Sequence, residues 1–525
     1  MANSIGAAIL VALIVLFVSK IFKVCLIVFW RPYALTKYFQ KQGVTGPPYS
    51  LLSGSLHEIK QMIKNARETV LDTNSNDFTE RVLPHYHKWS LLYGETFLYW
   101  FGTQPRLCIC EVELAKQILS NKFGFFLKPK TRPLLYTMIG KGLVLFNGLD
   151  WVNRRRLLTP AFSMNKLKVM IKRMAACTIS MLDEWKNQAI EAEGKSKKIE
   201  MNKEFRDLTA DIIAHSAFGS SLVQGKEAFK AQRELQQICV ASVADIFIPG
   251  SQYLPTPSNI QVWKLDKKLR YSIWSIIESR LLSEPTKDSS GYNTYGDDLL
   301  GLMMEATEMN KTQTSFKFNM NDIMEECKSF FFAGHETTSN LLTWTVFLLS
   351  LHNEWQEKLR QEVLQECGME IPSADMLAKL KLVNMVLLEA LRLYGPVLEL
   401  VREATQDMKL GNLLIPKGTC LAISMLMIHR SKEYWGEDAN EFNPLRFKDG
   451  VSKAAKHPNA LLAFSVGPRA CIGQNFAMLE AKTVIALILQ RFSLSLSPDY
   501  KHTPVNNLTL QAQNGLPIII KPLNL

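Results

Sequence analysis

The segment from Asn321 to Leu351 constrains the fold of this chain more than any other part of the sequence. Apolar and aromatic residues, among them Phe330 and Trp344, fall on nearly every face of its helical projection. A helix that is apolar nearly all round must be buried on all sides, because water would otherwise contact its hydrophobic faces. We therefore expect one unusually long helix that crosses the middle of the protein and starts at a cap formed by Asn319 or Asn321.

The rest of the chain also favours helices, with a few short strands. Apolar residues at three- and four-residue spacing predict helices over Leu167–Lys186 and Phe205–Phe218. A hydrophobic content of 47% excludes a disordered chain, and nine cysteines in 525 residues exclude a disulfide scaffold. The predicted fold class is mainly α with small β-sheets. The strand-like pieces are Thr96–Trp100, Leu107–Cys110, Thr419–Ile423 and Leu516–Ile520.

The N-terminus predicts one membrane anchor ahead of a large globular body. Residues 5–19 are apolar, and the apolar run resumes after two lysines until Trp30. A membrane span needs roughly 20 apolar residues, and no basic residue precedes the run as it would in a cleavable signal peptide. We expect an anchor over 1–30, a basic and Pro/Gly-rich linker over 31–50, in which Arg31-Pro32 and Gly46-Pro47-Pro48 break the helix, and one body over 51–525. The alternative is a core helix at the N-terminus.

Positive charge predicts the orientation of this anchor but leaves the partner open. Basic residues cluster after the apolar run, so the positive-inside rule places the N-terminus in the lumen and the body in the cytosol. The formal net charge is +12. Such a charge is compatible with a nucleic acid, a membrane surface or an acidic protein partner.

One cysteine near the C-terminus has the setting of a stabilised thiolate. Cys471 follows the turn-formers Gly467 and Pro468 and precedes a helix-like run over 475–490. The helix N-terminus and Arg469, two residues away, would both favour the charged form. A thiolate is either a nucleophile or a metal ligand. Zinc would need further ligands, no cysteine-protease signature surrounds Cys471, and a single thiolate suffices for haem iron.

The segment Phe464-x-x-Gly467-x-Arg469-x-Cys471-x-Gly473 is similar to the haem-binding signature of cytochrome P-450 monooxygenases. The resemblance covers essentially the whole chain, anchor included. It is closest to plant microsomal enzymes of the 72 clan, and within that clan to the family numbered 709. It implies a cytochrome P-450 fold preceded by one N-terminal transmembrane helix, with 51–525 as the haem-thiolate catalytic domain. The implied cofactor is haem b, bound beside Phe464 with Cys471 as the axial ligand of iron.

The resemblance also implies that residues 333–338 (Ala-Gly-His-Glu-Thr-Thr), in the middle of the long helix, lie over the haem on the oxygen side. Gly334 would let a ligand approach the backbone closely, and Thr337 can bond back to a helix carbonyl. Glu336 with Thr337 can relay protons. A capped kink is the alternative, but an acid beside a hydroxyl in an apolar helix is costly unless it is used. We expect Glu336 and Thr337 to be catalytic and His335 to be an ordinary helix histidine.

The haem propionates need cations and hydrogen-bond donors. Trp151 and Arg155 share a helix face at i, i+4, and the resemblance assigns both to the propionates, together with Arg402 and Arg469. Of the three successive arginines at 154–156, we expect one to face the haem and the others to face water.

A buried charge network is expected behind the haem loop. Glu389 and Arg392 share a helix face at i, i+3. The resemblance adds Arg446, from the segment Phe442-x-Pro444-x-Arg446, as a third member. It implies a structural role for all three residues, which is to position the Cys471 loop.

By family position, residues 134–139, 330–333, 397–400 and 511–516 line the substrate pocket, and most of them are apolar. An apolar small-molecule substrate follows. Glu399 is the exception; it either faces away and pairs with a surface lysine or binds a hydroxyl or amine of the substrate.

Electrons must come from another protein, because no dinucleotide fingerprint, flavin module or iron–sulfur module is evident in the sequence. The resemblance implies a membrane-bound NADPH–cytochrome reductase with an acidic docking face. The expected partners are this reductase, the lipid membrane and an apolar small molecule, and no nucleic acid. The expected location is the endoplasmic reticulum membrane, with a single span and a cytosolic catalytic domain.

Three functions remain open from the sequence. The first is a haem-thiolate monooxygenase that hydroxylates a fatty-acid-like, terpenoid or hormone-like plant metabolite with O₂ and electrons from NADPH. The second is a haem-thiolate isomerase or dehydratase that acts on hydroperoxides, and the third is a non-catalytic haem-binding membrane protein. Enzymes of the second kind usually lose the acid–threonine pair, so Glu336 and Thr337 favour the first.

Overall fold

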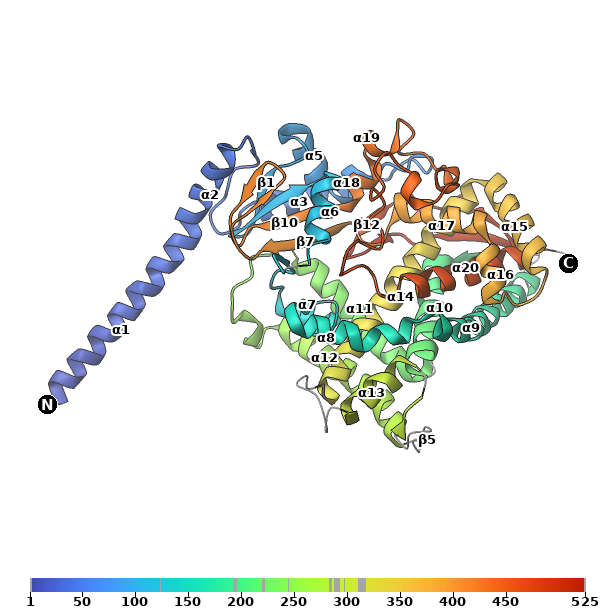
Figure 1. The fold of residues 1–525 in the computed structure, drawn as a ribbon, viewed down its shortest axis with the longest axis horizontal. Coiled ribbons are helices and arrows are strands. Elements are labelled where there is room, and N and C mark those ends of the chain that lie inside the picture. The colour runs from blue at the N-terminus through green and yellow to red at the C-terminus, as the bar shows by residue number, and fades with distance from the viewer. Residues whose placement is uncertain are drawn as a thin grey trace.

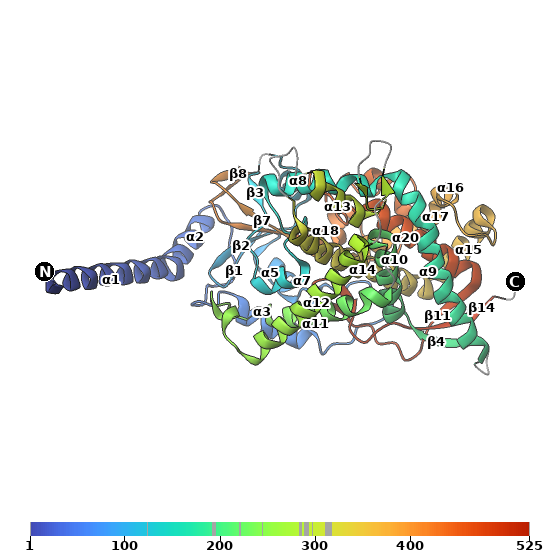
Figure 2. The same ribbon diagram turned by 90° about the horizontal axis from the view of Figure 1, so that it is seen from below.

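The computed structural model describes residues 2–122, 124–191, 196–219, 222–243, 245–282, 286–287, 293–296, 298–309 and 318–523. Helix α1 (Ala2–Cys25) projects from one end of the body, and a small sheet lies near its base (Figure 1). Long helices fill the rest of the molecule (Figure 2). The predicted fold class, mainly α with small sheets, is confirmed. The helices that matter below include α6 (Val112–Leu119), α8 (Gly148–Leu158), α9 (Met164–Glu191), α10 (Met201–Phe218), α11 (Leu222–Ser242), α17 (Lys381–Tyr394) and α20 (Gln474–Arg491).

The largest sheet has the strand order β1-β2-β10-β7-β3. The central strand, β10, pairs in parallel with β2 and antiparallel with β7, and all five residues of β10 are buried. A fourth predicted strand corresponds to β14 (Pro517–Pro522), between β11 (Phe492–Leu496) and β4 (Lys197–Glu200) in a separate sheet. All four strand predictions are therefore confirmed. The bounds in the first sheet are Leu98–Phe101 for β1, Gln104–Ile109 for β2, Phe126–Leu127 for β3, Glu399–Ala404 for β7 and Cys420–Ser424 for β10.

Helix α14 (Met320–Leu351) runs through the middle of the helical part, as predicted (Figures 1 and 2). Asn319 caps it: the side chain accepts hydrogen bonds from the backbone N–H of Asn321 and Asp322, and the Asp322 side chain accepts one from the Asn319 N–H. These bonds satisfy orphan donors of the first turn. Its sides are buried against α10, α17 and α20.

The predicted break at Arg31-Pro32 is wrong. The chain stays helical through a π-helical turn (Leu26–Trp30) and α2 (Arg31–Gln40). Pro32 has no N–H to donate and lies in the first turn of α2, where that donor is not needed. The irregular backbone begins later, before Gly46-Pro47-Pro48.

Helix α2 also packs against the body. Phe39 is completely buried, Arg31 Nη2 donates to the carbonyl of Gly418 at 3.2 Å, and Gln42 exchanges two hydrogen bonds with the backbone of Leu414. The helical stretch Ile9–Gln40 is the candidate membrane span within the described residues: it contains an 18-residue window with a mean hydropathy of 2.6, of which only 6% is buried.

A buried ion pair on α17 connects the core to the region before the Cys471 loop. Glu389 and Arg392 are both completely buried and lie 2.7 Å apart. Arg392 Nη1 donates to the carbonyl of His429, and His429 Nε2 accepts the backbone N–H of Leu462, both at 2.9 Å. This chain of bonds ends two residues before Phe464.

Arg446 joins the pair as the resemblance implies. Its Nε lies 3.4 Å from Glu389 Oε1, and its Nη1 donates to Asp438 Oδ1 at 3.0 Å. Asp438 is therefore a fourth charged member that the sequence did not indicate. The backbone N–H of Asn443 also donates to Glu389.

We predict that Arg392→Leu lowers the free energy of unfolding by about 3–5 kcal/mol, because it leaves the Glu389 carboxylate buried without its cation. Thermal unfolding and haem content measure the effect. Lys432→Ala is the control: it removes an exposed ion pair with Glu437 and should change both quantities little. Equal stability of the two variants would contradict a structural role for the buried pair.

Candidate active site

The loop before α20 holds Cys471 in a closed turn. The backbone N–H of Cys471 donates to the carbonyl of Phe464 at 2.8 Å, and that of Ala470 to the carbonyl of Gly467 at 3.1 Å. Gly467 has φ +78°, and a Cβ on it would lie 2.4 Å from the carbonyl oxygen of Leu119, at the end of α6. Only glycine fits this backbone and this close approach.

The Cys471 thiol faces a cavity, and its electrostatics differ from the expectation. Burial raises the pKa of the thiol, although the backbone N–H groups of Gly473 and Gln474 and the charge of Arg155 act to lower it. The helix N-terminus therefore contributes as predicted. The cation that acts on the sulfur is Arg155, however, and not Arg469. The effect of burial on the thiol pKa is larger than the effect of these contacts, so the pKa is raised overall.

Helix α14 supplies another wall of the same cavity. Thr337, Thr338 and Leu341 line it, with Phe464, Arg469 and Cys471 from the loop. The Thr337 hydroxyl donates to the carbonyl of Ala333 at 2.8 Å, as expected for a helix with a local notch. The other lining residues are Leu391, Pro396, Val397, Leu400, Met425, Leu462, Ala463, Ser465 and Ala477.

Cations gather at the edge of this cavity. Burial lowers the pKa of Arg402 to about 10 and that of Arg469 to about 10, and Arg402 further lowers the latter. Arg469 Nη1 is buried with no hydrogen-bond partner among the described residues. Buried cations with free donors fit an anionic group such as a carboxylate.

Lys128 belongs to this group, although the sequence did not single it out. Burial, Arg402 and Arg469 lower the pKa of its amine to about 7. Asn147 accepts hydrogen bonds from Arg469 Nη2 at 3.1 Å and from the backbone N–H of Lys128 at 3.0 Å. Only tertiary contacts bring Lys128 to this site, because it lies far from the motif residues in the sequence.

The other expected propionate residues lie nearby. The Arg469 guanidinium stacks over the Trp151 ring at 4.3 Å, and Arg155 Nη1 donates to the carbonyl of Ala470 at 3.0 Å. Arg156 is exposed, as predicted for a member of the arginine cluster. The expectation that Arg154 faces water is wrong: it is buried and bonds two acids of α14, Asp322 and Glu326.

Glu336 points away from the cavity into a polar network. Its carboxylate accepts hydrogen bonds from Thr509 Oγ1 at 2.7 Å, from Gln511 Nε2, and from Gln236 Nε2 at 3.3 Å. Burial acts to raise its pKa, but His335 and these three donors lower it below its ordinary value. Glu336 is therefore a buried carboxylate that is ionised at neutral pH.

These residues fit a haem bound through Cys471, because a thiol faces the cavity and cations stand at its edge, among them Arg469, whose Nη1 has no hydrogen-bond partner among the described residues. The cytochrome P450 family profile matches residues 69–521. This chain is a cytochrome P450.

Several proteins similar to this P450 come from plants. It is 54% identical to "Cytochrome P450 709B1" of Arabidopsis thaliana over 99% of both chains, and 54% identical to "Cytochrome P450 709B3" over 98% of both. A "Cytokinin hydroxylase" of the same plant is 40% identical, with 95% of this chain and 94% of the relative covered. The structure titled "Retinoic acid bound cyanobacterial CYP120A1" has the same fold: the TM-score is 0.70 at 23% identity, over 83% of this chain and 93% of that one.

The P450 is a monooxygenase by family, and its cofactor is haem with a cysteine-ligated iron. When bound, haem supplies the iron that activates dioxygen, and its thiolate ligand favours O–O cleavage.

Several residues of this P450 that were expected to line the pocket pack against side chains of the core. Phe330 stacks on Phe162 with ring centroids 5.7 Å apart, and Phe331 on Phe218 at 4.4 Å. A Cβ on Gly334 would lie 2.8 Å from Ile213 of α10, so this glycine allows close helix packing, not ligand approach. Of the four expected segments, only 397–400 contributes residues to the cavity described above.

Glu399 does not line this cavity, and its predicted lysine partner is wrong. Its carboxylate accepts a hydrogen bond from Tyr86 and lies 3.9 Å from Arg106 Nη1. Tyr86 also shares a hydrogen bond with Tyr99 at 2.9 Å. Glu399 is therefore part of a buried network beside the sheet.

We predict that Lys128→Met weakens haem binding by about 1.5–3 kcal/mol, roughly tenfold or more in affinity, through loss of one charge-assisted hydrogen bond. The rate of haem transfer to an excess of a haem-acceptor protein measures this. Lys130→Met is the matched control, since Lys130 is exposed two residues away. Identical transfer rates for both variants would exclude Lys128 from the propionate site.

Proposed function

We propose that this P450 hydroxylates a small apolar plant metabolite with O₂ and with electrons passed from NADPH by a membrane-bound reductase. The observation that supports this most is one cavity lined by the Cys471 thiol and by the Thr337 hydroxyl of α14. The thiol positions the cofactor, and the hydroxyl lies where a proton donor is needed.

The lining of the cavity supports an apolar substrate. Leu341, Val397, Leu400 and Met425 supply much of it, and apolar walls with few polar groups are typical of sites for such molecules. Two relatives near 40% identity are named for cytokinin hydroxylation. They support the hormone-like class among the fatty-acid-like, terpenoid and hormone-like candidates.

Glu336 and Thr337 are proposed to supply protons as a pair. Thr337 presents its hydroxyl to the cavity, and Glu336 is the ionised acid next to it in the chain. The hydroxyls and amides of Thr509, Gln511 and Gln236 hold the Glu336 carboxylate on the far side of the helix. In this arrangement Glu336 takes protons from its polar network and Thr337 delivers them in the cavity.

The proposed location is the endoplasmic reticulum membrane, with 1–30 as the anchor, 31–50 connecting it and 51–525 in the cytosol as the catalytic domain. The exposed apolar side chains of α1 support an anchor. The net charge of +12 supports docking of an acidic reductase face and an anionic lipid surface.

The reduced carbon monoxide complex tests the haem-thiolate site. The wild type should give the red-shifted Soret band of a thiolate-ligated haem, and Cys471→Ser should abolish this band. Absence of the band in the wild type would contradict the proposal. A screen of cytokinins, terpenoids and fatty acids then follows, with NADPH and a plant reductase. Turnover with a hydroperoxide that persists without NADPH would favour the isomerase or dehydratase instead.

Glu336→Gln should lower turnover per haem by about 10²-fold or more, because general acid–base catalysis contributes about that factor, and it should leave the carbon monoxide spectrum unchanged. Glu399→Gln is the control: it changes another hydrogen-bonded carboxylate that lies outside the cavity. Equal turnover of both variants would remove Glu336 from proton delivery.

A further inference from the structure

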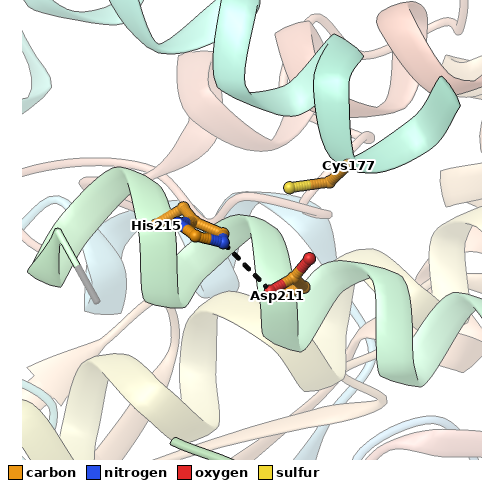
Figure 3. A group of neighbouring side chains, drawn as sticks. All are labelled: Cys177, Asp211 and His215. Carbon is orange, nitrogen blue, oxygen red and sulfur yellow. Dashed lines mark ion pairs between the residues drawn. The ribbon is translucent and has the colours of Figure 1, made fainter. Parts of the chain in front are cut away.

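A second group of metal-binding side chains lies away from the haem site. Cys177 of α9 and Asp211 and His215 of α10 point toward one another across the interface of the two helices (Figure 3). Asp211 and His215 share one face of α10, because residues at i, i+4 are neighbours on a helix. None of the three is among the residues that line the haem cavity.

The geometry of the cluster suits a tetrahedral metal ion. One ligand atom from each residue lies within 4.8 Å of the others, and His215 Nε2 is 3.4 Å from Asp211 Oδ1. Zinc bonds of about 2.0–2.2 Å to nitrogen and oxygen at tetrahedral angles separate two such ligands by roughly 3.4 Å. All three residues are partly exposed, so an ion can reach them from solvent.

Acidic side chains lie near the Cys177 sulfur. Burial, followed by Asp211 and Glu480, raises the pKa of the Cys177 thiol to about 12. Glu480 of α20 is buried, and the Thr338 hydroxyl is hydrogen-bonded to its carboxyl group. Burial raises its pKa well above the ordinary value. A dication at the cluster would offset the negative charge of Asp211 and of a Cys177 thiolate.

We propose that Cys177, Asp211 and His215 bind one Zn²⁺ ion, with a water molecule in the fourth position. Thiolate, imidazole and carboxylate are the ligands that zinc combines. Mg²⁺ and Ca²⁺ prefer oxygen ligands alone, so the thiol and the imidazole select a transition metal. Glu480 is a nearby acid in this site and not a ligand.

The bound ion would join α9 to α10. A hydrogen bond of 2.9 Å from Arg173 Nη1 of α9 to the carbonyl of His215 already links the helices at this level. A ligand that binds the folded chain stabilises it by mass action. Zinc should therefore raise the melting temperature of the haem-loaded protein.

The test uses the full-length, haem-loaded protein, stripped with a chelator and then dialysed against micromolar Zn²⁺. Elemental analysis separates zinc from haem iron. We expect one zinc per chain, a shift of the melting temperature upward, and protection of Cys177 from alkylation by Zn²⁺ but not by Mg²⁺. Cys177→Ser and His215→Asn should each reduce the retained zinc at least tenfold.

His457→Asn is the matched control, because His457 also pairs with a carboxylate, that of Glu113, but has no thiol in a metal-binding group. It should retain zinc like the wild type. The proposal is overturned if the wild type retains no zinc, or if Cys177→Ser retains as much as His457→Asn. Alkylation of Cys177 at an unchanged rate in Zn²⁺ would also overturn it.

Discussion

The ion pair between Glu389 and Arg392 is the interaction on which the haem site depends. Two charges with no access to water are stable only when each is fully paired and hydrogen-bonded. Here Arg392 also satisfies backbone carbonyls of the segment before the cysteine loop, including that of His429, and His429 in turn holds Leu462. These bonds join the buried pair to the segment that leads into the Cys471 loop, and breaking them would leave a buried charge unpaired.

Helix α14 runs through an apolar core and yet contains polar residues of the site. Aromatic stacking by Phe330 and Phe331 packs its first half against neighbouring elements. One turn further on, the Thr337 hydroxyl donates a hydrogen bond to the helix backbone. The ionised Glu336 carboxylate is stabilised by side-chain donors from α11 and β13 (Leu510–Ala512). Thr337 and Glu336 are adjacent in the sequence, but their side chains lie on opposite sides of the helix.

At both the haem cavity and the Cys177 cluster, the neighbouring side chains favour a bound group of one charge. At the cavity edge, burial lowers the pKa values of Lys128, Arg402 and Arg469, and Arg402 further lowers those of the other two, a setting that fits the acidic groups of the cofactor. At the α9–α10 interface the partly exposed Cys177 thiol lies beside the Asp211 carboxylate, a setting that suits a cation instead. Charge of one sign at a site is unfavourable, and a bound group of the opposite sign reduces that cost.

The sequence by itself determined the features that depend on local pattern: the length and cap of α14, the four strands, the fold class and the Cys471 motif. Periodicity and turn residues encode these directly. Tertiary structure alone decided that Arg154 pairs with Asp322 and Glu326, that Lys128 lies near Arg402 and Arg469, that Glu399 meets Tyr86 and Arg106, and that Cys177 faces α10. Each of these contacts depends on which helix or strand packs alongside. The residues next to a side chain in the sequence do not show which partners it will meet across such an interface.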